Sequence, residues 1–357
     1  MGTFILRRLI LSIPVLLGIL FLTFALTRLL PGDPCRAALQ EKATEEACNA
    51  FNQRYGLDRP ITVQFKIYLQ DFVQGDLGTS IKYNYSVMRL IVERLPTTLE
   101  LSIMAMFFAV AVGIPLGLLS AYYHNSSIDI GTMVIANIGV SMPVFWLGLM
   151  LAYFFAVVLK GTPFVLPPSG SQSPGMQIQP FYEAWGLNIE PARSSVWAFI
   201  SNMTITNAAL AGDWAGFKDG FRHMILPMVA LGTIPMSIIA RMTRSSLLEV
   251  LGQNYVKTAR AKGAYERNVV LNHAFRNAML PVVTIIGLSL GSLLSGALLT
   301  ETIFGLAGVG SALYDAINGR DYTVVQAFTV IIAVIFVIIN LLVDVLYVFL
   351  DPRIRLN

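Results

Sequence analysis

The chain is poor in charged residues, cysteine and histidine, and each scarcity excludes a class of protein. Asp, Glu, Lys and Arg make up 13% of the 357 residues, whereas 55% are hydrophobic, and the mean hydropathy is +0.65. Because a soluble domain carries about 25% charged residues, we expect lipid to surround much of this chain. The histidines, His124, His223 and His273, lack the close spacing of metal ligands, so no metal site is predicted.

A phosphate-binding loop is also missing from the sequence. The pattern G-x-x-x-x-G-K-[ST], which cradles nucleotide phosphates, does not occur, and the glycine-rich FGLAGVG at residues 304–310 lacks the required lysine. This glycine cluster is instead expected to form a turn. We predict that the chain is not an enzyme and needs no cofactor of its own.

Long apolar runs are what the sequence has in abundance. A helix needs about 20 mainly apolar residues to cross about 30 Å of hydrocarbon, and six runs meet this requirement. They lie at residues 9–30, 99–122, 130–159, 224–240, 279–299 and 324–350. The sequence therefore predicts an all-α membrane protein with six transmembrane helices. The first run is too long for a signal peptide and no cleavage site follows it, so we expect it to be retained.

The positions of lysine and arginine predict the orientation, because these residues remain on the cytoplasmic side. The segment between the fourth and fifth runs contains Arg241, Arg244, Lys257, Arg260, Lys262, Arg267 and Arg276, against only Glu249 and Glu266. Arg7, Arg8, Arg353 and Arg355 add basic residues near both ends. We expect both termini in the cytoplasm. The segment 122–129, between the second and third runs, should also be cytoplasmic, and it has no lysine or arginine. The net charge of +4 is explained by topology and does not indicate a nucleic-acid partner.

Both cysteines fall in the first external segment, which runs over residues 31–98. An oxidising compartment allows Cys35 and Cys48 to form a disulfide, and the alternative is two free thiols. Prolines and glycine at residues 31–34 end the first helix, and a helix-favouring stretch follows. We therefore expect a small extracytoplasmic subdomain here. The second long external segment, 160–223, is either an interaction surface or a plain insertion.

Polar residues inside the apolar runs are few, and they are the candidates to line a polar path. They are Asn137, Ser141, Thr284, Ser289, Ser292 and Ser295. The alternative for the serine and threonine positions is that small residues allow helices to pack closely. Asp344 is the ionisable residue well inside the last run, and we expect it to form an internal hydrogen bond. A relay of buried protons would need further carboxylates or histidines.

The segment RMTRSSLLEVLGQNYVKTARAKGAYERNVVLNHAFRNAMLP at residues 241–281 is basic, helical in pattern and too polar to span a membrane. Val256, Ala259 and Gly263 recur at helical spacing. This small-residue face would let another protein approach closely, with Lys257, Arg260 and Arg267 available for its acidic groups. The alternative is a basic face attracted to anionic lipid headgroups, and the spacing alone does not decide between them.

The motifs YVKTARAKG and HAFRNAMLP in this segment resemble the cytoplasmic loop of permease subunits of binding-protein-dependent ABC importers, specifically the oligopeptide and dipeptide branch. The resemblance covers the whole chain. It includes LPGDP at 30–34, RYGLDRPITVQ at 54–64, GDLGTS at 75–80, RLPTTLELS at 94–102, SMPVFWLGL at 141–149, ETIFGLAGVG at 301–310 and LLVDVLYVFLDPRIR at 341–355. The general Glu-Ala-Ala-x-x-x-Gly loop pattern of these permeases maps onto Lys257, Thr258, Ala259 and Gly263, of which only Ala259 and Gly263 match.

This resemblance implies a type I ABC importer permease fold in a bacterial or archaeal inner membrane. Residues 1–94 would form the anchor helix and external subdomain, and residues 95–357 the core permease domain with five transmembrane helices. A coupling loop at about 241–278 would contact the ATPase through Lys257, Thr258, Ala259, Arg260 and Gly263. The chain resembles the first of two non-identical permeases, so the implied partners are a second permease, two ATPase subunits that bind ATP and Mg, and an external substrate-binding protein.

Peptides are the substrate that this resemblance implies, although the same branch includes permeases for nickel chelates, glutathione and sugars. A proton-coupled secondary transporter is a less favoured alternative, because it usually needs more spans and buried titratable groups. A channel or membrane scaffold would have no need for a basic docking loop.

Overall fold

The computed structural model describes residues 2–29, 35–36, 43–54, 56–187, 189 and 195–350. Within these residues the chain forms helices joined by loops, and no β-strand is formed. The predicted all-α class is confirmed. The side chain of Asp344 lies outside the described residues, as do Arg353 and Arg355.

Five helical segments are long and apolar enough to cross a membrane, and a bent pair makes a sixth span if its halves are counted together. The main helices of the five are α1 (Gly2–Leu29), α5 (Val87–Tyr122), α11 (Trp214–Leu251), α14 (Arg276–Ile303) and α16 (Tyr322–Leu350). α5, α11, α14 and α16 each contain one of the predicted runs, and α1 contains residues 9–29 of the first run. α5, α11 and α14 each continue through one or two internal prolines. These helices are longer than the apolar runs, so polar residues beside the runs are helical too.

The span predicted at residues 130–159 is not one straight helix. Its parts are α6 (Ser127–Ser141), α7 (Val144–Tyr153) and the π-helical turn η2 (Phe154–Val158). The chain bends by 106° between the axis of α6 and that of the second half, residues 144–158. Pro143 explains the break, because the residue before a proline is driven out of the helical region, and Met142 is extended with φ −116° and ψ 138°.

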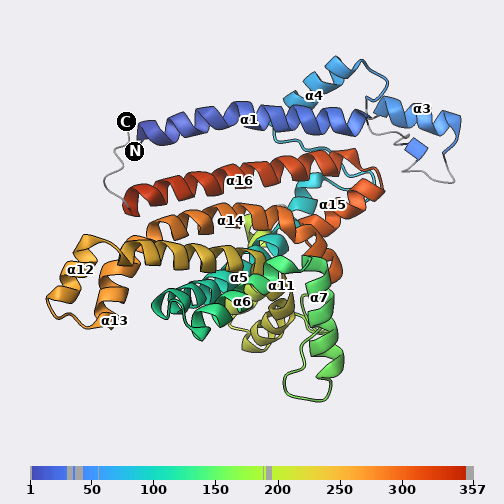
Figure 1. Ribbon diagram of the computed structural model, residues 1–357. Coiled ribbons are helices and arrows are strands. Elements are labelled where there is room, and N and C mark those ends of the chain that lie inside the picture. The colour runs from blue at the N-terminus through green and yellow to red at the C-terminus, as the bar shows by residue number, and fades with distance from the viewer. Residues whose placement is uncertain are drawn as a thin grey trace.

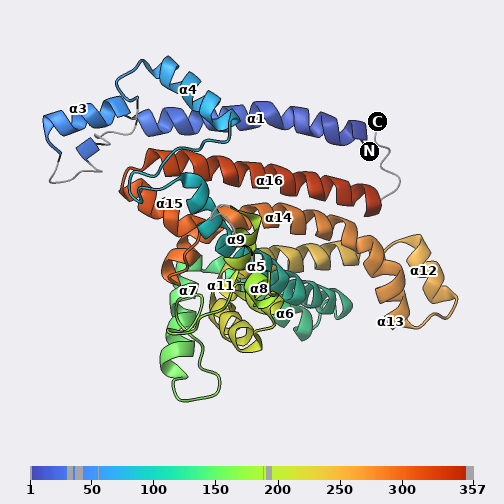
Figure 2. The same cartoon turned by 180° about the vertical axis from the view of Figure 1, so that it is seen from behind.

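Shorter helices and one π-helical turn connect the long helices. They are α3 (Glu45–Arg54), α4 (Ile61–Val73), α8 (Phe181–Ala184), α9 (Val196–Ser201), α10 (Thr204–Ala211), α12 (Asn254–Ala261), α13 (Glu266–Asn268), the π-helical turn η3 (Val269–Phe275) and α15 (Val309–Asn318). Both views place α3 and α15 at one end, and α12 and α13 at the other, where α1 begins and α16 ends (Figures 1 and 2).

The centre of the molecule is the contact between α5 and α11, which is the most extensive in the chain. Glycines allow the two backbones to approach closely. A Cβ added at Gly117 would lie 2.4 Å from the carbonyl oxygen of Ala240, and one added at Gly232 would lie 2.6 Å from that of Ala105. Close approach through small residues is how membrane helices associate, because lipid supplies no hydrophobic drive between them.

The anchor helix α1 lies against α16 at the edge of this core (Figure 1). Little of its spanning window is buried, as expected for a helix that faces lipid. The external subdomain is tied to the core through Asp321, which precedes α16. Its Oδ2 accepts hydrogen bonds from Ser80 Oγ at 2.5 Å and from Lys82 N at 3.1 Å. The predicted domain boundary at residues 94 and 95 falls inside the continuous helix α5, so this division remains a prediction.

Candidate functional site

The basic segment folds into a compact unit formed by α12, α13 and η3, which we call the basic hairpin (residues 254–275). It extends beyond the ends of α11 and α14 (Figure 2). Its inner face is apolar, with Val256, Val269 and Ala274 fully buried in one cluster with Leu247 of α11 and Ala278 of α14. The hairpin is therefore anchored to two spanning helices, and a displacement of α12 must move their ends.

The small-residue face of α12 does not point where the sequence suggested. Val256 is buried, and Ala259, three residues later on the same face, packs half-buried against the same cluster. Both residues contact the hairpin's own core because that core needs an apolar cover. Of the residues predicted to contact the ATPase, Ala259 faces this core, whereas Lys257, Thr258, Arg260 and Gly263 are exposed. Ala261 and Lys262 are exposed beside them, and the contact with the ATPase stays a prediction.

Arg260 and Gly263 shape the turn that follows α12. The Arg260 guanidinium binds Glu266 with two hydrogen bonds, Nη2–Oε1 at 2.7 Å and Nε–Oε2 at 3.1 Å, and this contact raises the pKa of Arg260. Gly263 has φ +82°, and no atom lies within 4 Å of an added Cβ. Within this chain Gly263 is therefore needed for its left-handed backbone and not for close packing.

Asp129 anchors the loop between α5 and α6 near the hairpin. Arg244 of α11 donates to it through Nε to Oδ1 and through Nη2 to Oδ2, both at 2.9 Å. Ser120 Oγ and the backbone N–H of Asn125 also donate to it. The segment 122–129 has no lysine or arginine of its own, and Arg244 of α11 places a positive charge beside it. The Arg244–Asp129 ion pair was not predicted from the sequence. Its one indication in the sequence is that Asp129 is the only acidic residue of the segment 122–129, which has no lysine or arginine.

Two of the predicted path residues lie on α6. Asn137 Oδ1 accepts a hydrogen bond from Arg241 Nη1 at 3.1 Å and from Ser237 Oγ at 3.4 Å, so it joins α6 to α11. Ser141 is exposed and donates to the carbonyl of Asn137 at 3.0 Å. This pair presents a polar strip that ends at the bend before α7.

The other four predicted path residues lie on α14 and do not form one cluster with the α6 pair. Ser292 and Ser295 are exposed, whereas Ser289 is buried within the chain. Thr284 and Ser292 donate to carbonyls of their own helix, at 3.1 and 2.8 Å. The exposed serines thus leave a weakly polar strip on α14 that this chain does not cover.

Glu301 is fully buried at the end of α14 away from the hairpin. Its Oε1 accepts from Thr98 Oγ1 at 2.6 Å and its Oε2 from the backbone N–H of Ser311 at 3.1 Å. A Cβ added at Gly308 would lie 2.2 Å from the carboxyl carbon of Glu301. The glycine cluster predicted to form a turn therefore wraps a buried carboxylate and joins α14, α15 and α5.

Glu100, two residues after Thr98 in α5, has a similar structural role. Its Oε1 accepts from the backbone N–H groups of Ile205 and Thr206, at 3.0 and 2.8 Å, and from the Thr206 hydroxyl at 2.9 Å. These contacts satisfy N–H groups at the start of α10, which have no partner inside their helix. The two carboxylates thus position α10 and the start of α15.

Cys35 and Cys48 form a disulfide, with Cα atoms 5.4 Å apart. Among the described residues, no cluster of three or more His, Cys, Asp or Glu side chains has the geometry to hold a metal ion.

Two family descriptions match consecutive parts of the chain. "Binding-protein-dependent transport system inner membrane component" matches residues 113–356, and "Binding-prot-dependent transport system membrane comp, N-term" matches residues 1–102. The first covers more than half of the chain. The chain belongs to this family of inner-membrane transport components. The family resemblance drawn from the sequence motifs is confirmed.

Several characterised proteins are similar to the chain over almost its full length. A dipeptide transport system permease protein, DppB, of Alkalihalophilus pseudofirmus is 43% identical over 99% of this chain and 100% of the relative. DppB of Escherichia coli is 42% identical over 99% of this chain and 98% of the relative. A di/tripeptide permease protein of Pseudomonas aeruginosa is 42% identical over 99% of each chain.

A solved structure of the MetNI methionine ABC transporter, in an inward-facing conformation, has a chain with a similar fold. The TM-score is 0.52 with 18% sequence identity, over 73% of this chain and 96% of that one. At this identity the likeness speaks for the fold alone, and it confirms the predicted type I importer permease architecture.

Proposed function

We propose that this chain is the permease subunit of an ATP-driven peptide importer and forms half of its membrane path. The observation that carries the proposal is the 42–43% identity, over nearly the whole chain, to permease subunits of dipeptide and di/tripeptide transport systems. The basic hairpin adds support, because a permease that lacks a phosphate loop needs a contact through which a separate ATPase can move it.

The proposed assembly has a second, homologous permease beside this chain, two ATPase subunits that bind ATP and Mg, and an external binding protein that delivers the peptide. Both termini and the basic hairpin face the cytoplasm. The joint position of the hairpin, the start of α1 and the end of α16 at one end of the molecule supports this orientation. The exposed strip of Ser292 and Ser295 on α14 faces the second permease, where the path runs.

The exposed face of α12 is the proposed docking surface for an ATPase subunit. It carries Thr258 and Ala261 between Lys257 and Lys262, so small side chains allow close approach while the lysines meet acidic groups. The alternative is that the same face rests on anionic headgroups, at about 1 kcal/mol per basic residue. Replacing both lysines by glutamine would remove about 2 kcal/mol of membrane attraction in the alternative, whereas in the proposal it would weaken co-purification of the ATPase subunits.

Growth of a bacterial host tests the function. Deleting the gene for this chain in an amino-acid auxotroph should prevent growth on a dipeptide that contains the required amino acid. Growth on the free amino acid should continue, and a plasmid copy should restore growth on the dipeptide. If the deletion instead abolishes uptake of nickel, glutathione or a sugar and leaves dipeptide growth intact, the importer class stands and the substrate assignment is wrong.

A further inference from the structure

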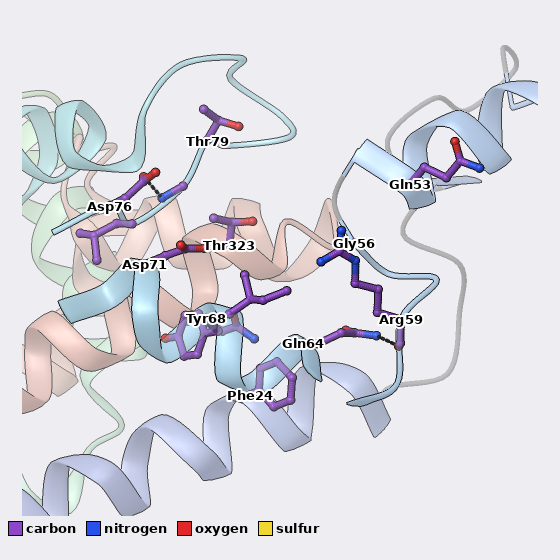
Figure 3. Close-up of a pocket in the computed structure, with 14 residues that line it drawn as sticks. Phe24, Gln53, Gly56, Arg59, Gln64, Tyr68, Asp71, Asp76, Thr79 and Thr323 are labelled. Atoms are coloured by element: carbon purple, nitrogen blue, oxygen red, sulfur yellow. Dashed lines mark hydrogen bonds between the residues drawn. The ribbon is translucent and has the colours of Figure 1, made fainter. Parts of the chain in front are cut away.

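A cavity of about 410 Å³ lies between the external subdomain and the spanning helices (Figure 3). Its walls come from the end of α1, from α4, from the segment before α5 and from the start of α16. Sites for small molecules usually measure about 300–1,000 Å³. None of the six predicted path residues lines this cavity, so it is separate from the path proposed above.

Opposite charges occupy different sides of the cavity. Arg59 lies with Gln64 on one side, and Asp71 and Asp76 lie on the other (Figure 3). A hydrogen bond of 2.7 Å from Gln64 Nε2 to the carbonyl of Arg59 fixes the loop that carries the guanidinium. In the described part of the chain, none of these three charged side chains takes part in an ion pair. A ligand with a negative and a positive end would pair with both sides.

Aromatic side chains pack beneath the cavity. Tyr68 stacks on Phe24 of α1 with ring centroids 5.8 Å apart, and Phe24 also contacts Phe65 at 5.2 Å. The Tyr68 hydroxyl is buried and has no hydrogen-bond partner among the described residues. Burial raises the pKa of Tyr68 to about 12, so the hydroxyl keeps its proton at physiological pH. The hydroxyl is not accessible from the cavity, so Tyr68 contributes its ring to the wall and no hydrogen bond to a ligand.

We propose that this cavity binds short peptides with free termini. Arg59 binds the terminal carboxylate, since a guanidinium pairs with a carboxylate through two parallel hydrogen bonds. Asp71 and Asp76 bind the terminal ammonium group. The site rests on the proposed function as a peptide importer, and it adds a peptide contact on this chain outside the central path.

The test is equilibrium binding of radiolabelled dialanine to the assembled transporter in nanodiscs, without the binding protein. Arg59→Gln should weaken binding about 10- to 100-fold, as loss of a charge-assisted hydrogen-bond pair predicts. Lys66→Gln on the exposed side of α4 and Asp58→Asn beside the cavity are matched controls, because neither residue lines it. Both should bind dialanine like the parent protein. Dialanine with an acetylated amino end and an amidated carboxyl end should not compete.

Three results would overturn the site. They are absence of saturable dialanine binding, equal binding by Arg59→Gln and Lys66→Gln, and competition by the capped peptide. Asp71→Asn provides a second variant if Arg59→Gln does not fold, as judged by size-exclusion chromatography. Uptake of dialanine in the presence of the binding protein is measured in parallel. Normal uptake with no effect of the cavity variants rejects the site and leaves the proposed function standing, whereas absence of uptake by the parent transporter rejects the proposed function itself.

Discussion

Gly117→Ala is the substitution that most directly tests the packing of α5 on α11. The added Cβ would lie 2.4 Å from the Ala240 carbonyl oxygen and 2.6 Å from Cβ of Thr243. Carbon atoms in contact normally sit about 3.5–4.0 Å apart, so the two helices must separate by about 1 Å at this point. The neighbouring atoms belong to the backbone and to a β-branched side chain, neither of which can rotate away.

The expected cost follows from two opposing effects. Overpacking a close contact costs about 1–3 kcal/mol, while alanine is a better helix former than glycine by about 1 kcal/mol. The net change is a loss of up to about 2 kcal/mol. Gly18→Ala in α1 is the matched control, because no atom lies within 4 Å of its added Cβ, and it should be neutral or slightly stabilising.

Thermal unfolding in detergent, followed by size-exclusion chromatography, measures this difference. Gly117→Ala should unfold at a lower temperature than the parent protein, and Gly18→Ala at the same temperature or a higher one. Because α11 leads directly to the basic hairpin, Gly117→Ala should also reduce substrate-stimulated ATPase activity of the complex. Equal stability of the two variants would refute the close α5–α11 contact.

Three further predictions follow from the contacts described above. Asp129→Asn should lower the free energy of unfolding by about 1–3 kcal/mol because Arg244 loses a charged partner. The double variant with Arg244→Gln should lose less stability than the sum of the single changes. Additive losses in thermal unfolding would contradict the pairing. Cys35 and Cys48 should resist alkylation in denatured, non-reduced protein and react after reduction, and labelling before reduction would exclude the disulfide. Thr258→Trp on the exposed face of α12 should prevent the ATPase subunits from co-purifying while membrane insertion is normal, and full co-purification would reject that docking face.

The sequence predicted the spanning helices well because hydropathy depends on local composition alone. Hydropathy did not reveal the bend between α6 and α7, because residues 130–159 are apolar on both sides of it. The signal was Pro143, which disfavours a helical conformation at Met142. Proline was not decisive by itself, because Pro115 and Pro227 lie inside continuous helices.

The sequence did not reveal that Val256 and Ala259 face the core of the hairpin itself, because helical spacing shows which residues share a face, but not what that face contacts. Val256 and Ala259 suit a partner surface and an internal core equally well. The buried cluster with Leu247 and Val269 is formed by segments on either side of α12, and their arrangement could not be read from the pattern.

The buried carboxylates were also beyond sequence reasoning. Glu301 and its hydroxyl donor Thr98 are 203 residues apart in the chain, and no local pattern relates them. In the sequence Glu301 stood out only as the first residue of the motif ETIFGLAGVG at 301–310. Its neighbour Gly308 gave a usable signal, because a glycine-rich turn often marks a close contact with another group.

Reconstituted transport tests the central claim that this chain is one permease subunit of an ATP-driven peptide importer. The measurement is uptake of labelled dialanine into proteoliposomes that contain this chain, its partner permease and the two ATPase subunits, with loaded binding protein outside and ATP inside. Uptake should require ATP hydrolysis, persist when the proton gradient is collapsed, and be absent when this chain is reconstituted alone. Uptake by this polypeptide alone, driven by a proton gradient without ATP, would contradict the account.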